Sequence, residues 1–266
     1  MGRETVTSAQ NPKIKELLAL QEKSKLRREK GLFVVEGRRE LGHCLDAGFR
    51  VRTVFVCPDI FRDEIPGIPD TAVVEVSRAV YEKIAYREGT EGILAEMYAR
   101  ERRLEDLRLS SAPLVIVLES VEKPGNLGAV LRSADAAGAD AVIICDPATD
   151  LYNPNLIRAS IGSVFTRQVA VASSEETIAW RRARGIRIYT AQLQDSVWYY
   201  DTDMTGGTAI VMGTESTGLT DRWRQAADQH IRIPMLGRLD SLNVSVSAAI
   251  LLFEAVRQRQ GGSLHP

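Results

Sequence analysis

The sequence predicts an α/β protein of two domains, the larger of which contains a parallel sheet. The first observation is a regular alternation of short apolar runs and amphipathic segments from Leu114 onward, which is typical of a sheet covered by helices on both faces. The others are a smaller set of strand and helix patterns before it and a charged, proline-ended run between the two sets. We therefore expect an N-terminal domain at 1–99, a linker at 100–113 and a C-terminal domain at 114–266.

The N-terminal domain is expected to begin with a helix, because Asn11 is a helix cap and Pro12 is favoured at a first helical position. Strand and helix patterns follow it. We expect a strand at 33–35, a helix from 36 to Gly48, strands at 52–56 and 72–76, a helix at 77–86 and a strand at 92–98.

The segment 11–30 is basic, with seven basic and three acidic residues, although the whole chain has a net charge of -1. A basic segment on a near-neutral protein is typical of a polyanion binder, because lysine and arginine contact phosphates. We expect Lys23, Lys25, Arg27 and Arg28 to make such contacts. A solvated helix surface is the competing interpretation.

The C-terminal domain is expected to alternate strands and helices to its end. We expect strands at 114–119, 141–145, 167–172, 187–193, 208–212 and 230–235, and helices at 126–137, 155–163, 174–184, from 220 and at 243–253. The last helix carries no charge and has apolar or small residues on every side. A helix of this kind is buried on all sides, so it is wedged into the domain or shared with a second subunit.

Gly213 lies at the carboxyl end of an expected strand, where the ligands of parallel sheets bind. Gly213 and Gly218 are spaced as in a phosphate-binding loop, but Leu219 stands where that loop requires a lysine, and Glu215 repels a polyphosphate. The loop therefore suits a neutral or cationic ligand. A turn whose glycines serve the backbone alone is the competing interpretation.

Polar residues also begin two helices. The helix at 126–137 places Arg132 opposite its apolar side, and a surface arginine paired with Asp135 is the competing interpretation. Ser241 and Asn243 precede the last helix. Either one suits a helix cap, so the two together are more than a cap requires.

Several classes of protein are not supported. An odd number of cysteines with no C-x-x-C arrangement does not favour a disulfide framework or a zinc site; the three are Cys44, Cys57 and Cys145. The histidines are scattered without the spacing of metal ligands; they are His43, His230 and His265. We also find no apolar stretch of about 18 residues for a membrane span and no signal peptide, so we expect a soluble, cytoplasmic protein.

Three segments resemble, in order and spacing, the motifs of the SpoU (TrmH) family of RNA ribose 2'-O-methyltransferases in the SPOUT superfamily. They are N-L-G-A-V-L-R at 126–132, I-V-M-G-T-E-S-T-G-L at 210–219 and I-P-M-L-G-R-L-D-S-L-N-V-S-V-S-A-A-I at 233–250. The N-terminal domain, with T-S-A-Q-N-P-K-I-K at 7–15 and F-V-V-E-G-R-R at 33–39, looks like the small RNA-binding domain of that family, which is similar to ribosomal protein L30e.

This resemblance implies a deep trefoil knot at the C-terminal end, S-adenosylmethionine held in the knot, and a homodimer packed through the knot region. It implies cofactor contacts from Met212, Gly213, Glu215, Gly218, Ile233, Met235, Leu242 and Asn243. It implies a catalytic set of Asn126, Arg132, Glu215, Ser241 and Asn243. The implied RNA contacts are those of Lys23, Lys25, Arg27, Arg28, Arg38 and Arg39.

The implied reaction is methyl transfer to a ribose 2'-hydroxyl of RNA. Arg132 is expected to orient the ribose or anchor its phosphate, because a guanidinium is too firmly protonated to act as a base. The type of N-terminal domain favours ribosomal RNA over transfer RNA. A non-catalytic RNA-binding protein and a methyltransferase acting on a base nitrogen are the alternatives. A Rossmann-type methyltransferase is disfavoured, since no glycine-rich turn follows the strand at 114–119.

Overall fold

The computed structural model describes residues 3–63, 67–86, 91–147 and 149–261. The chain forms two compact units. The N-terminal unit comprises Met1–Arg100 and Asp150–Thr166, and the C-terminal unit comprises Glu101–Thr149 and Arg167–Pro266.

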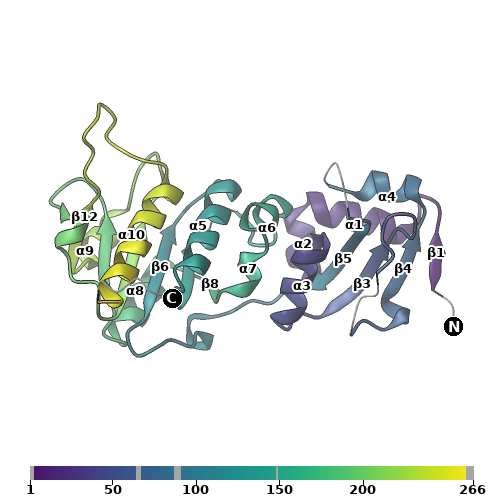
Figure 1. Ribbon diagram of the computed structural model, residues 1–266, viewed down its shortest axis with the longest axis horizontal. Coiled ribbons are helices and arrows are strands. Elements are labelled where there is room, and N and C mark those ends of the chain that lie inside the picture. Colours follow the sequence, from purple (N-terminus) through teal and green to yellow (C-terminus); the bar gives the residue numbers. More distant parts are fainter. Residues whose placement is uncertain (1–2, 64–66, 87–90, 148, 262–266) are drawn as a thin grey trace. The chain divides into compact units, whose positions relative to one another are not determined.

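The N-terminal unit is built on a five-stranded mixed sheet with the order β1-β4-β3-β5-β2 (Figure 1). Its strands are β1 (Glu4–Val6), β2 (Leu32–Glu36), β3 (Val51–Val56), β4 (Val73–Val76) and β5 (Ile93–Tyr98). Its α-helices are α1 (Pro12–Glu22), α2 (Ser24–Lys30), α3 (Arg38–Asp46), α4 (Arg78–Ile84), α6 (Pro154–Ser160) and α7 (Ser163–Thr166). The sequence predicted all of these strands except β1, which is too short to show a periodic pattern.

Local signals explain the first helices. The Asn11 side chain accepts a hydrogen bond from the backbone N–H of Lys13 at 2.9 Å, and Pro12 follows it as expected. The basic segment 11–30 contains two helices, and Gly31 ends the second in the left-handed conformation with φ at 60°. The apolar side of α1, formed by Ile14 and its neighbours, packs in the core of the unit.

The segment Asp150–Thr166 belongs to the N-terminal unit, although the alternation of the sequence continues through it into the C-terminal domain. The ring of Tyr152 stacks on Phe33 with centroids 4.2 Å apart, and Phe165 stacks on the same ring at 5.6 Å. These long-range aromatic contacts hold the segment in place, and they cannot be predicted from the local periodicity of the sequence.

The C-terminal unit contains a seven-stranded sheet with the order β10-β12-β9-β11-β6-β7-β8, in which every strand pair is parallel. The predicted parallel α/β architecture is therefore confirmed. The strands are β6 (Leu114–Glu119), β7 (Ala141–Cys145), β8 (Val169–Ala172), β9 (Arg187–Ala191), β10 (Val197–Trp198), β11 (Thr208–Met212) and β12 (Gln229–Arg232). Only the two-residue β10 has no counterpart among the expected strands.

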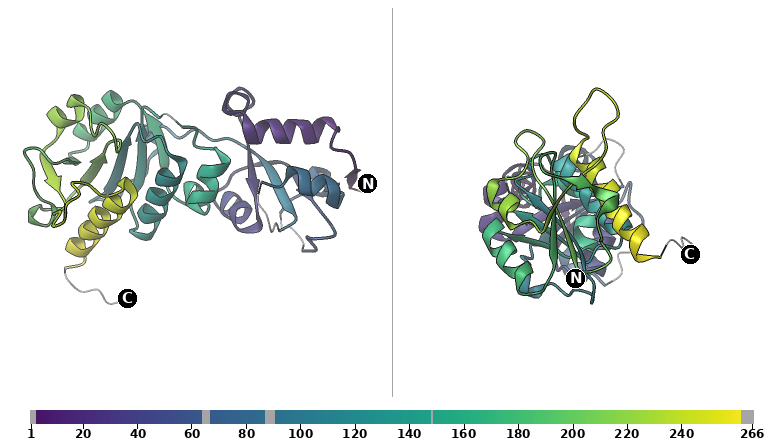
Figure 2. Two further views of the ribbon diagram at one scale, coloured as in Figure 1. Left: turned by 90° about the horizontal axis from the view of Figure 1, so that it is seen from above. Right: turned by 90° about the vertical axis from the view of Figure 1, so that its left-hand side faces the viewer.

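Helices cover both faces of this sheet (Figures 1 and 2). They are α5 (Pro124–Ala136), α8 (Ser174–Arg182), α9 (Asp221–Ala226) and α10 (Val244–Arg259). Helices α5 and α10 pack against each other, and α8 and α9 form the second layer. Residues Leu104 and Leu107 of the expected linker are 4% and 8% exposed in the core beneath α8 and α9, so this stretch is packed on the C-terminal unit.

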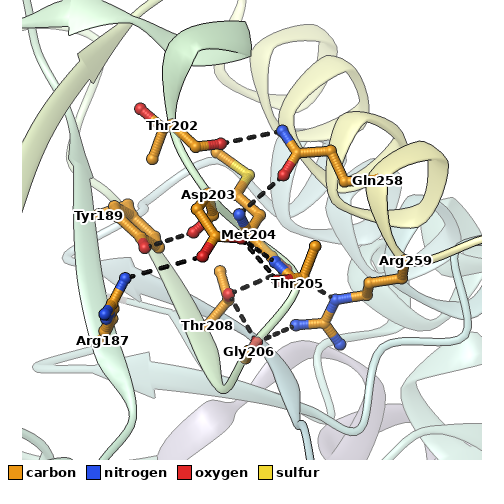
Figure 3. A network of polar contacts seen from close by, with 10 residues as sticks. All are labelled: Arg187, Tyr189, Thr202, Asp203, Met204, Thr205, Gly206, Thr208, Gln258 and Arg259. Atoms are coloured by element: carbon orange, nitrogen blue, oxygen red, sulfur yellow. Dashed lines mark hydrogen bonds and ion pairs between the residues drawn. The ribbon is translucent and has the colours of Figure 1, made fainter. Parts of the chain in front are cut away.

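Helix α10 is anchored at its C-terminal end by a network of polar contacts (Figure 3). The guanidinium of Arg259 donates hydrogen bonds to the carbonyl oxygens of Ala112, Met204 and Gly206 at 2.7, 3.0 and 2.7 Å. Burial lowers the pKa of Arg259, but these carbonyl dipoles compensate part of the lost hydration. Gln258 adds a hydrogen bond to the carbonyl of Thr202 at 2.9 Å. The helix is thereby fixed over the start of β6 and β11.

Strands β6 and β11 are neighbours in the sheet, and Met212 pairs with Leu118 near their carboxyl ends. After β6 the chain passes through α5 to β7, which pairs with β6 on the side away from β11. The strand order therefore changes direction between β6 and β11, which is where ligands of open parallel sheets bind. Among the described residues, no helix is long and apolar enough to cross a membrane.

Candidate active site

Four polar side chains meet at the carboxyl ends of β6 and β11, and we call them the polar cluster: Lys123, Asn126, Glu215 and Asn243. The carboxylate of Glu215 accepts from Lys123 Nζ at 2.8 Å, from Asn126 Nδ2 at 3.0 Å and from Asn243 Nδ2 at 2.7 Å. Asn243 Nδ2 also donates to Asn126 Oδ1 at 3.1 Å. Three segments that are far apart in the sequence thus converge on one carboxylate.

The charge of the polar cluster is set by the pair of Lys123 and Glu215. The hydrogen bond from Lys123 lowers the pKa of Glu215, and the same contact raises the pKa of Lys123. The carboxylate therefore stays ionised at neutral pH. Both side chains face solvent, so the pair can rearrange around a ligand at little cost.

The loop after β11 is shaped by its two glycines. A Cβ on Gly213 would lie 2.2 Å from the carbonyl oxygen of Gly218, so no other residue fits at this position. Thr214 and Gly218 exchange backbone hydrogen bonds, and Gly218 has φ at +68°. The glycines thus meet a backbone requirement of the loop, and the loop they close presents Glu215 to the polar cluster.

Asn243 has two roles in this arrangement. Its Oδ1 accepts from the backbone N–H of Ser245 at 2.9 Å and so caps α10. Its Nδ2 remains free to donate to Glu215 and Asn126. Ser241 is not the cap of α10, which is Asn243, and its hydroxyl donates to the carboxylate of Asp240 at 3.2 Å.

Arg132 is not a member of the polar cluster. Its side chain is exposed on α5 and makes no hydrogen bond or ion pair with any residue that the structure describes. Asp135, the partner considered for it, pairs with Arg167 at 2.8 Å instead. The guanidinium of Arg132 is therefore available to a ligand in solution.

The remaining expected cofactor contacts lie at the same edge of the sheet. Met212 is buried at the end of β11, whereas Ile233 and Met235 are half-buried after β12. Leu242 is 39% exposed just before α10. These segments border the carboxyl ends of neighbouring strands, since β9 pairs with both β11 and β12.

Two residues of this region were missed by the sequence analysis. Lys123 lies in the turn between β6 and α5, immediately before the helix, and Gln192 directly follows β9. Gln192 donates its backbone N–H to the carbonyl of Ile231 at 3.0 Å, and its side-chain Oε1 is buried with no partner in the described part of the chain. The rule that selected Gly213, a position just after a parallel strand, would have selected Gln192, whereas Lys123 lies four residues beyond the end of β6.

The expected RNA contacts of the N-terminal unit need one correction, at Arg27. Its side chain is 3% exposed, and its Nε lies 2.6 Å from the carboxylate of Asp150. It also donates to the carbonyls of Leu20 and Gln21. Arg27 therefore holds the fold together and is not accessible to RNA.

The other basic residues expected to contact RNA are on the surface. The exposed side chains are those of Lys23, Lys25, Arg28, Arg38 and Arg39. Among groups of histidine, cysteine, aspartate and glutamate in the ranges that the structure describes, none is arranged to hold a metal ion.

Comparison with known proteins gives the following matches. The SpoU rRNA Methylase family matches residues 113–253, and the MRM3-like substrate binding domain matches residues 11–95. The 23S rRNA (guanosine(2553)-2'-O)-methyltransferase RlmP of Bacillus subtilis is 29% identical over 248 residues, which cover 93% of this chain and 97% of that protein. The 23S rRNA (uridine(2479)-2'-O)-methyltransferase of Streptomyces viridochromogenes is 30% identical, with 96% and 93% covered. The crystal structure of an AdoMet-bound rRNA methyltransferase from Sinorhizobium meliloti is 33% identical with a TM-score of 0.86, and 96% of this chain and 97% of that chain are covered.

Proposed function

This chain belongs to the SpoU rRNA methylase family and is an S-adenosylmethionine-dependent RNA ribose 2'-O-methyltransferase, and we propose how its residues carry out the reaction. The observation that carries the proposal is the convergence of all three family motifs on Glu215 at the carboxyl ends of β6 and β11. Ribosomal RNA is the substrate, since relatives that match nearly the whole chain are named for it.

The polar cluster suits the cofactor chemically. S-adenosylmethionine supplies a methyl group activated on a positively charged sulfur. Glu215 provides an ionised carboxylate, which attracts that charge, and the glycine loop provides backbone groups. We propose that Met212, Gly213, Gly218, Ile233, Met235 and Leu242 hold the cofactor. Gln192 adds an amide oxygen that has no protein partner and can accept a hydrogen bond from it.

The protein must then orient the ribose for in-line attack, since the methyl donor is already activated. Asn126 and Asn243 are bonded to each other and to Glu215, so their amides form a rigid edge that positions the reacting groups. Glu215 is a weak base because Lys123 lowers its pKa, and we assign it to positioning. Arg132 remains protonated and anchors the ribose or its phosphate. Ser241, next to the cap of α10, completes the catalytic set.

We propose that the segment from β12 to α10 forms the deep trefoil knot of the SPOUT superfamily. Strand β12 pairs with β9 on the far side of β11, and the chain then returns to pack α10 on β6 and β11. This return crosses the strand order of the sheet, which an ordinary doubly wound sheet does not require. The crossing supports a threaded C-terminal segment.

We also propose a homodimer that packs through α10. In a single chain, Val246 and Phe253 are each 47% exposed. They lie seven residues apart on one side of this helix, and Leu242 extends the same apolar surface. A second copy covers such a stripe by two-fold packing. We place the enzyme in the cytoplasm, because the relatives that match nearly the whole chain are bacterial enzymes of ribosomal RNA.

The reaction is tested by incubating the protein with S-adenosylmethionine and unmodified ribosomal RNA, followed by alkaline hydrolysis. A ribose 2'-O-methyl group blocks cleavage at its own linkage, so one band disappears from the hydrolysis ladder. Methyl incorporation with an intact ladder would instead show base methylation, and RNA binding without cofactor binding would show a non-catalytic protein. Transfer RNA incubated in parallel tests the alternative substrate.

A further inference from the structure

The N-terminal unit contains an open cavity of ≈ 580 Å³ beside the start of α3. Ile60 and Phe61, from the loop after β3, provide apolar surface in it, and Arg38 and Arg62 provide positive charge. Its volume lies within the range of about 300–1,000 Å³ that small-molecule sites occupy. The cavity is therefore large enough for a nucleotide.

The arginines of this cavity are accessible. Arg62 is exposed and makes no hydrogen bond or ion pair with the described residues. Arg38 pairs through its guanidinium with Asp63, but the two side chains are 64% and 55% exposed. An exposed ion pair of this kind contributes about 0–1 kcal/mol, so another anion can replace Asp63.

A second carboxylate lies at the start of α3. The Oε2 atom of Glu91 accepts a hydrogen bond from the backbone N–H of Arg38 at 2.5 Å. Gly37, the residue before the helix, offers no side-chain cap, and a Cβ there would lie 2.8 Å from Oε2 of the buried Glu40 and 3.6 Å from Oε2 of Glu91. Glu91 thus binds to a backbone donor that equally suits a phosphate oxygen.

We propose that this cavity binds one nucleotide of the RNA substrate, with the base against Phe61 and the phosphate at Arg38 and Arg62, and that Asp63 and Glu91 compete with that phosphate. The proposal rests on the proposed function, because RNA is the ligand. An aromatic face beside arginines is the chemistry that holds an unpaired nucleotide. The carboxylates weaken binding to any polyanion, so only RNA that also places a base on Phe61 binds well.

The test measures the affinity of the full-length protein for an unmodified 23S ribosomal RNA transcript at several salt concentrations. Arg62→Ala is expected to weaken binding about threefold to tenfold and to reduce the salt slope by about 1. Asp63→Asn is expected to tighten binding about threefold. Phe61→Leu, which keeps apolar bulk but lacks a stacking face, is expected to weaken binding about tenfold, and Phe61→Tyr is expected to retain affinity.

Matched controls come from the exposed ion pair of Arg78 and Glu82 on α4, which lies outside the cavity. Arg78→Ala and Glu82→Gln make the same charge changes and are expected to alter RNA affinity less than twofold. Equal losses in Arg62→Ala and Arg78→Ala, or weaker binding by Asp63→Asn, would overturn the proposal.

Cofactor titration and methyl transfer at saturating RNA separate this proposal from the proposed function. Cofactor affinity is expected to be unchanged in the Arg62 and Asp63 variants. If the wild-type protein methylates RNA and all cavity variants bind it equally, only the cavity proposal fails. If the wild-type protein binds the transcript but transfers no methyl group, the proposed function fails. The RNA affinities of the cavity variants then still test whether the cavity binds a nucleotide.

Discussion

Replacing Asn243 with serine or with alanine separates its two roles. Serine caps helices about as well as asparagine, so Asn243→Ser is expected to change the free energy of unfolding by only a few tenths of a kcal/mol. Asn243→Ala removes the acceptor of the Ser245 N–H and is expected to cost about 1 kcal/mol, or about 2–4 °C in Tm. Both variants lose the amide that donates to Glu215 at 2.7 Å.

Cofactor affinity is expected to fall in both variants. Glu215 keeps its contacts with Lys123 and Asn126 and loses one of three hydrogen-bond donors, so the loss is about three- to tenfold. Calorimetric titration with S-adenosylmethionine measures the affinity, and urea unfolding measures the stability. Asn153→Ala is the matched control, because Asn153 caps α6 and has no contact with the polar cluster. It is expected to lower stability alone.

Two results would refute this reasoning. Full cofactor affinity in Asn243→Ser would show that Asn243 is only a helix cap. A loss of stability in Asn243→Ser as large as that in Asn243→Ala would show that capping is not what this residue contributes to the fold.

Further changes test other parts of the molecule. Arg132→Ala is expected to lose most methyl transfer while cofactor affinity and cooperative melting are kept; equal loss of binding and activity, or full activity, contradicts the assigned role. Phe253→Glu is expected to produce monomers in sedimentation, because it places a charge in the apolar stripe of α10; an unchanged dimer contradicts the interface. Reversing Lys25 and Arg28 to glutamate is expected to weaken RNA binding and flatten its salt dependence without altering cofactor affinity; unchanged binding makes α2 a solvated helix. Burial raises the pKa of Glu96 to about 7, from an ordinary value of 4.5, against the attraction of Arg52. The carboxyl of Glu96 therefore binds its proton more tightly in the folded state than in the unfolded state. Its contribution to the free energy of unfolding is fully present below pH 4.5 and is lost as the pH rises through 7, a loss of about 3 kcal/mol. Glu96→Gln is expected to remove this loss in urea unfolding at pH 5 and pH 8; an identical pH dependence in both proteins contradicts it.

Local patterns in the sequence predicted most elements of the fold. The strand at 114–119 was located to the residue, because a continuous apolar run bounded by polar residues has one interpretation in a parallel sheet. The last helix extends to Arg259, six residues beyond the expected end, since its final turns carry charges that an apolar pattern does not include. Its composition predicted a helix wedged into the domain or shared with a second subunit, and Val246 and Phe253 are half-exposed in one chain, so a single chain does not bury it on every side.

Short-range patterns were enough to order the elements, to place the glycine loop after β11 and to locate Asn126, Glu215 and Asn243 after their strands, because caps, glycines and periodicity act over a few residues. Which side chains meet depends on long-range packing. Lys123 reaches Glu215 across 92 residues, and Arg27 is buried against Asp150 across 123 residues. Contacts of this range depend on strand order and on the packing of distant helices, which no local pattern contains.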